Sequence, residues 1–170
     1  MHELAITVIG PDRTGIVADV SEALAGAGAN LSDSTMTRLR GHFAMTLICT
    51  GPDAVSVEKA LAPLSADGRL LATVRAVQPE EDTAGAGEPW LVSVHGADRL
   101  GIVAAVTREV AGAGGNITDL STRLAGTLYV LIAEVDLPAG AADELAQHLA
   151  VAASELGVDV TLRRADSEIL

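Results

Sequence analysis

The chain has 170 residues, of which 49% are apolar, and its formal net charge is −12 at pH 7. This apolar content is enough to build hydrophobic cores, and the length fits one ordinary domain or two small ones. The acidic charge disfavours nucleic-acid binding, which normally needs a basic surface, and is typical of a soluble protein. Aromatic residues make up only 2%, so Val, Ile, Leu and Ala must fill the cores.

The cysteine content and the N-terminus bear on where the protein works. A single cysteine, Cys49, excludes an intramolecular disulfide and fits a reducing compartment. It lies in an apolar run typical of a strand, so we interpret it as a core residue. No signal-peptide pattern opens the chain, and no apolar run approaches the ~20 residues of a membrane span. We therefore expect a cytoplasmic protein that does not bind membranes.

The sequence repeats itself. At an offset of 86, residues 8–33 align with residues 94–119, and fifteen of these 26 positions are identical. Agreement at this level indicates a duplication. Further along, the match of Gly41 with Gly126 predicts that the second copy has lost one residue.

A charged and glycine-rich stretch separates the two copies. We predict a flexible linker at 79–88 between a first module at 1–78 and a second at 89–170. Each module is near the lower size range for independent folding. We therefore expect the two to pack side by side through strand edges or helices, and a homodimer built by the same contacts fits the duplication.

The elements of the first copy follow from its apolar periodicity and its turn signals. In chain order the pattern predicts a strand at 4–9, a helix from Arg13, strands at 29–39 and 42–50, a helix at 57–64 and a strand at 70–77. The apolar stripe of the first helix is Ile16, Val20, Leu24 and Ala27. We place Asp12 as its N-cap, and Gly26 and Gly28 as its stop.

The second copy repeats this order. The stripe of its second helix is clear: Leu145, Leu149, Ala152 and Leu156. The order βαββαβ, twice, predicts an α+β fold of two ferredoxin-like modules, each an antiparallel sheet with both helices on one face. RNA-recognition modules share this order but stack bases on aromatic residues of the sheet. The strands here offer only Phe43 and Tyr129, which disfavours RNA binding.

One motif occurs in both copies. It reads GPDRTGIVA followed by GANLSD in the first copy, and GADRLGIVA followed by GGNITD in the second. These residues resemble the ACT domain, a small amino-acid-sensing module attached to many metabolic enzymes and regulators. The whole chain is similar to stand-alone tandem ACT proteins of the glycine cleavage system transcriptional repressor type. That resemblance implies two sensing modules that act through a DNA-binding partner rather than on DNA itself.

The chemistry of the motif favours a small ligand. A helix N-terminus exposes unpaired N–H groups and the positive end of the helix dipole, which suits a carboxylate. A glycine in the first turn lets another group approach the backbone, and an asparagine that begins the next strand, beside the helix start, both donates and accepts. The candidate ligand-binding residues are Asp12, Arg13, Gly15, Asn30, Asp98, Arg99, Gly101 and Asn116.

A purely structural interpretation stays open for each of these residues. The aspartates fit plain N-caps, the glycines permit close helix packing, the arginines fit solvated surface, and the asparagines suit turn positions. Recurrence in both copies shows common descent, and does not by itself show that both sites bind.

Catalytic and metal-binding patterns are absent from the sequence. The four histidines, which are His2, His42, His95 and His148, do not stand in metal-ligand spacing. His42 and His95 do not recur in the other copy, where Thr127 and Ile9 stand at the aligned positions. No nucleophile motif or phosphate-binding loop occurs. We expect no enzyme activity, no metal and no cofactor.

Two functions remain. The first is an amino-acid-binding regulatory protein, such as a transcriptional co-regulator acting through a protein partner, with glycine or serine as the expected class of ligand. The second is a non-sensing subunit that docks on an amino-acid biosynthetic enzyme.

Overall fold

The computed structural model describes residues 2–78 and 87–165. The chain divides into two compact units, Met1–Thr83 and Ala84–Leu170, which we call module 1 and module 2. Most of the predicted linker lies outside the described residues. Its last residue, Glu88, is the first residue of a strand.

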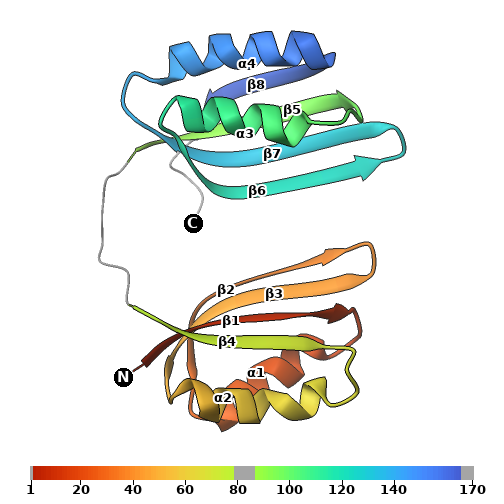
Figure 1. The fold of residues 1–170 in the computed structure, drawn as a ribbon, viewed down its shortest axis with the longest axis vertical. Helices are drawn as coiled ribbons and strands as arrows, with labels where there is room; N and C mark the ends of the chain where they lie inside the picture. Colours follow the sequence, from red (N-terminus) through yellow and green to blue (C-terminus); the bar gives the residue numbers. More distant parts are fainter. Residues whose placement is uncertain (1, 79–86, 166–170) are drawn as a thin grey trace. The chain divides into compact units, whose positions relative to one another are not determined.

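Module 1 is a four-stranded antiparallel sheet with both helices on one face (Figure 1). The strand order in the sheet is β2-β3-β1-β4. Its elements are β1 (His2–Pro11), α1 (Ile16–Gly26), β2 (Asn30–Leu39), β3 (His42–Gly51), α2 (Ala54–Leu61), the 3₁₀ helix η1 (Ala62–Ser65) and β4 (Leu71–Val77).

Module 2 repeats this architecture, with strand order β6-β7-β5-β8 and both helices on one face of the sheet (Figure 1). Its elements are β5 (Glu88–Ala97), α3 (Ile102–Gly112), β6 (Asn116–Ala125), β7 (Leu128–Leu137), α4 (Ala142–Leu156) and β8 (Val158–Arg164). The predicted α+β class, with two ferredoxin-like modules, is confirmed.

Each module has its own core between sheet and helices. The predicted stripe of α1 is buried at Ile16, Val20 and Leu24. Phe43 is fully buried, and Tyr129 packs half-buried against the core of module 2. Because both rings face the helix layer, neither lies on the open face of its sheet, where an RNA-recognition module would display them.

The β2–β3 and β6–β7 hairpins correct the predicted loss of one residue in the second copy. Every element from β1 to β3 recurs 86 residues later, as α1 and α3 do (102 − 16). Both turns have two residues. Arg40 (φ 49°) and Gly41 (φ 82°) are both left-handed in the first turn, whereas Gly126 (φ 62°) alone is left-handed in the second. The glycine has changed place within the turn, so the alignment of Gly41 with Gly126 was wrong. Leu128, rather than Thr127, is the counterpart of His42.

The stop signal of α1 is confirmed at Gly28, which has a φ of 80°. Its N–H donates to the carbonyl of Ala25 at 2.9 Å, and the next N–H, of Ala29, donates to the carbonyl of Leu24 at 3.0 Å. This pattern is a Schellman motif, which glycine favours because it has no Cβ. Gly114, with a φ of 73°, ends α3 in the same way.

The second helices of the modules differ. α2 has 8 residues and continues into η1, whereas α4 has 15 residues and leads through Gly157 into β8. α2 begins three residues before the predicted range 57–64, because Asp53 caps it by accepting the N–H of Ser56 at 3.0 Å. The segment between η1 and β4 therefore exists only in module 1.

Candidate functional site

The start of α1 differs from the prediction. The helix begins at Ile16, and its N-cap is Gly15, which has a φ of 83° and supplies no side-chain cap. In module 2 the N-cap is Gly101, with a φ of 92°. The prediction that Asp12 caps the helix is therefore wrong. The left-handed glycine turns the chain into the helix and leaves the aspartate three residues upstream, too far from the first helical N–H groups.

The charged residues of this loop have partners within module 1. The N–H of Asp12 donates to the carbonyl of Gly41 at 2.9 Å, and its carboxylate lies 3.4 Å from the guanidinium of Arg38. Arg13 pairs with Asp19 on α1 at 2.6 Å. These contacts tie the β1–α1 loop to the tip of the β2–β3 hairpin and to its own helix.

Asn30 does not lie beside the helix start within its own module, which corrects the prediction. β1 and β2 are both antiparallel to β3, so they run in the same direction. Asn30 is level with Glu3 at the beginning of β1, because both pair with Thr50, whereas Asp12 follows the end of β1. At ~3.3 Å per strand residue, the asparagine and the helix start are about 30 Å apart.

Asn116 occupies the same place in module 2, since it pairs with Asp136 opposite Pro89 at the start of β5. The physical reason is the crossover: each first helix runs back along its sheet, so its end, and not its start, adjoins the next strand. The predicted order of strand, helix and strand already implied that the asparagine lies at the end of the helix and not at its start.

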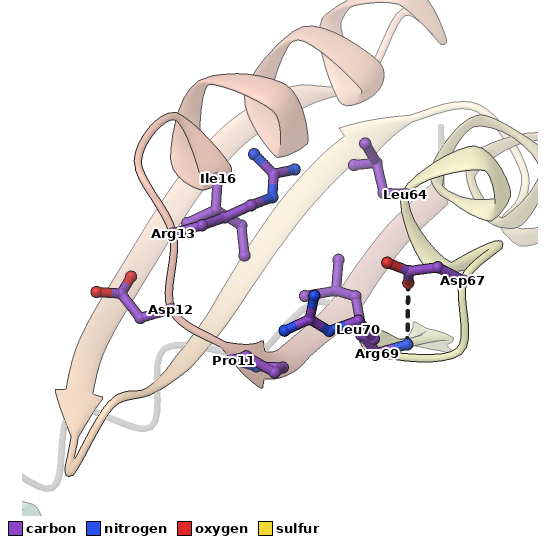
Figure 2. A pocket seen from close by; sticks show the side chains of 8 residues that line it. All are labelled: Pro11, Asp12, Arg13, Ile16, Leu64, Asp67, Arg69 and Leu70. Atoms are coloured by element: carbon purple, nitrogen blue, oxygen red, sulfur yellow. Dashed lines mark hydrogen bonds between the residues drawn. The ribbon is translucent and has the colours of Figure 1, made fainter.

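A small cleft of about 100 Å³ adjoins the β1–α1 loop of module 1 (Figure 2). Eight residues from two segments line it: Pro11, Asp12, Arg13, Ile16, Leu64, Asp67, Arg69 and Leu70. The two segments meet closely, because a Cβ built on Gly10 would lie 2.6 Å from the carbonyl oxygen of Arg69. Glycine at this position therefore allows the chain before β4 to pack onto the end of β1.

The second wall of the cleft, which includes Asp67 and Arg69, was not among the residues predicted from the sequence. Both belong to the connection into β4, and β4 pairs with β1 through Ile9 and Leu71. In the ferredoxin-like topology the start of the last strand lies beside the end of the first. The predicted ferredoxin-like topology could therefore have pointed to the residues before the last strand.

The corresponding loop of module 2 has a different surface. An open depression of about 590 Å³ is lined by residues 98–104 and Tyr129. Leu100, which stands where module 1 has Thr14, is fully exposed. Of the predicted residues, Asp98, Arg99 and Gly101 lie together here.

The other titratable groups that the structure describes do not meet the needs of a metal site. In residues 2–78 and 87–165 no three His, Cys, Asp or Glu side chains gather as a metal would require. His95 lies 3.4 Å from Asp159, and His148 lies 3.5 Å from Glu109, as surface pairs. Burial raises the pKa of the Cys49 thiol, as expected of a core residue. No helix among the described residues is long and apolar enough to cross a membrane.

The fold is a tandem pair of ferredoxin-like modules with equivalent loops before their first helices. The family model described as "ACT domain" matches residues 2–76 and 88–163. The chain belongs to the ACT domain family.

Relatives match one module at a time. A UPF0237 protein from Methanopyrus kandleri is 42% identical over 82 residues, which are 48% of this chain and 91% of that protein. A UPF0237 protein from Methanocaldococcus jannaschii is 37% identical over 78 residues, which are 45% of this chain and 87% of that protein. These relatives are therefore about half as long as the present chain.

Solved structures match both modules together. An unknown protein from Galdieria sulphuraria is 31% identical, with a TM-score of 0.81, over 97% of this chain and 99% of that one. A candidate glycine cleavage system transcriptional repressor is 22% identical, with a TM-score of 0.74, over 98% of each chain. The second likeness is one of fold alone.

Proposed function

We propose that this protein is a non-catalytic regulatory protein that binds a small amino acid. The observation that carries the proposal is the cleft beside the start of α1, where Arg13 and the first helical turn lie on one wall (Figure 2). Since Gly15 is the N-cap, no side chain of the cap occupies the first N–H groups. A carboxylate is the group that a helix start and a guanidinium both favour.

The size of the cleft supports a small ligand. Its volume of about 100 Å³ is well below the ~300–1,000 Å³ typical of sites for drug-sized molecules. Glycine or serine is the class of ligand that we propose. Asn30 and Asn116 lie at the far ends of their own modules, so neither reaches a ligand at the first helix start of its own module.

The proposed role in the cell is that of a cytoplasmic co-regulator that acts through a protein partner, as the similarity to tandem ACT repressors suggests. A net charge of −12 supports action through a partner rather than on DNA. We expect the isolated chain to give no shift of duplex DNA at physiological ionic strength. Salt-sensitive binding in that assay would contradict this role.

A thermal-shift screen of the full chain against the common amino acids tests the sensing function. A ligand at 100 times its Kd stabilises a fold by about 2.7 kcal/mol, which is a readily measured rise in Tm. We expect glycine or serine to give this rise in the wild type and a smaller one in Arg13→Gln. If no amino acid raises the Tm at millimolar concentration, the sensing function is wrong.

One observation favours the alternative function, docking on a biosynthetic enzyme without sensing. Leu100 is a large apolar side chain, fully exposed at the rim of the open depression of module 2. Val103 and Tyr129 line the same depression, and contiguous exposed apolar surface marks protein-interaction sites. A partner whose binding ignores amino acids, and is lost in Leu100→Ser, would establish docking. A partner whose binding changes with the ligand would support sensing.

A further inference from the structure

The two modules offer different charges at their helix starts. In module 1 the cleft combines Arg13, from the β1–α1 loop, with Arg69, from the segment before β4. In Figure 2 both side chains lie along the cleft, while the carboxylate of Asp12 points away from it. Two arginines from segments more than fifty residues apart therefore line one small cleft.

The backbone holds Arg69 in place. The chain on which it lies packs directly against Gly10, where any Cβ would approach the Arg69 carbonyl oxygen to 2.6 Å. Its N–H donates to Asp67 Oδ1 at 2.9 Å, and Gly68 between them takes a φ of 72°. The segment thus forms a tight Asx turn whose conformation favours glycine at its centre.

The guanidinium of Arg69 is available for a ligand. Arg13 already pairs with Asp19, but among residues 2–78 and 87–165 no carboxylate lies within 4.0 Å of Arg69 as an ion-pair partner. Asp67 lies on the same wall, and its carboxylate is directed toward the cleft in Figure 2. A cation and an anion side by side match the carboxylate and the ammonium of an α-amino acid.

Module 2 lacks this wall. Counting back from the starts of β4 and β8, Leu156 stands where module 1 has Arg69, and it packs against the hydrophobic core. Because α4 leads through Gly157 alone into β8, no Asx turn stands opposite the helix start. Among the residues that the structure describes, Arg99 is the only cation lining the depression of module 2.

From these differences we propose that module 1 alone holds the amino acid, that Arg69 binds its carboxylate, and that Asp67 binds its ammonium group. Arg69 is then the specificity-determining residue, and each chain has one site rather than two. This assignment rests on the proposed function, because it names the module and the residues of the same binding activity.

Isothermal titration calorimetry of the full chain with glycine and with serine tests the assignment. We expect one site per chain, and no binding of ethanolamine, which is serine without its carboxylate. Loss of a charge-assisted hydrogen bond should weaken binding at least about tenfold in Arg69→Gln. Arg69→Lys keeps the charge and should weaken binding less. Asp67→Asn should also weaken the binding of the amino acid, because its ammonium group would lose an anionic partner.

The matched control is Arg75→Gln, which removes an arginine from β4 at a position paired with Ala5, away from the cleft. It should bind like the wild type, and circular dichroism should show that every variant folds. Two equivalent sites per chain, or unchanged binding in Arg69→Gln together with weakened binding in Arg99→Gln, would overturn the assignment while leaving the proposed function intact. If neither glycine nor serine binds, both the assignment to module 1 and the proposed function are wrong.

Discussion

The two modules agree over their first three strands and first helix, and diverge after them. From β1 to β3 each element recurs at a constant offset, with a left-handed glycine before each first helix and a Schellman glycine after it. The second helices differ in length, and the end of the first strand packs against Arg69 in module 1 but against Val158 in module 2. The comparison shows that duplication preserved the scaffold while the last third of each module changed the surface beside the shared loop.

The largest difference between the modules should appear at equivalent aromatic positions of the core. Phe43→Ala should destabilise the protein by about 3–5 kcal/mol, because the ring is fully buried. Tyr129→Ala should cost less, since that ring is only partly buried. Urea denaturation followed by circular dichroism measures both. Because Trp90 lies in module 2, its fluorescence reports the second change separately. An equal cost at both positions would contradict the burial that distinguishes them.

The N-cap glycines should respond alike. Gly15→Ala and Gly101→Ala should each cost about 1–2 kcal/mol, because both positions have a positive φ and a Cβ there meets nothing within 4 Å. The cost is therefore conformational, and Gly101→Val should destabilise module 2 by more, because a β-branched residue tolerates a positive φ less well than alanine. Asparagine, which tolerates this conformation, provides the control: Gly15→Asn should lower the Tm less than Gly15→Ala does. A large difference between the two modules would break their equivalence.

The cap of α2 should make part of the stability of module 1 depend on pH. The hydrogen bond from the Ser56 N–H lowers the pKa of Asp53. A group with a lowered folded pKa stabilises the fold above its unfolded value, ~3.9, and loses that contribution as the pH falls through the folded value.

Asp53→Ala should therefore lower the Tm at neutral pH, and the difference from the wild type should vanish in strong acid. Asp53→Asn keeps a capping acceptor without the charge, so its Tm at neutral pH should lie between those of Asp53→Ala and the wild type. A Tm difference that persists unchanged below the folded-state pKa would show that the carboxylate charge contributes nothing.

The smallest effect should come from the ion pair between Arg38 and Asp12. The pair is exposed, so Arg38→Ala should cost at most about 1 kcal/mol, and salt should reduce the cost. Module 2 has Leu124 at the equivalent position, and Leu124→Arg would give it a matching partner for Asp98. Denaturant unfolding measures both changes. A change in the free energy of unfolding well above about 1 kcal/mol would contradict the assignment of a weak surface ion pair.

Local signals predicted much of the fold. The α1 stripe predicted the buried face of that helix, and the glycine pattern predicted its Schellman stop, since both depend on residues within a turn or two of one another. Matching glycines across the β2–β3 turn misled, because Arg40 takes the left-handed position that Gly126 takes in the other copy. Residue identity was a poorer guide there than strand register.

The sequence by itself determined the duplication, the order of the elements, the faces that form the cores and the family motif, all of which are carried by local pattern and spacing. Only the tertiary structure decided that Gly15 replaces Asp12 as N-cap, that Asn30 lies at the far end of its module, and that Arg69 joins the cleft. The physical reason is that these relations depend on strand direction and on backbone contact between distant segments, such as that of Gly10 with Arg69. Neither leaves a periodic signal in the chain.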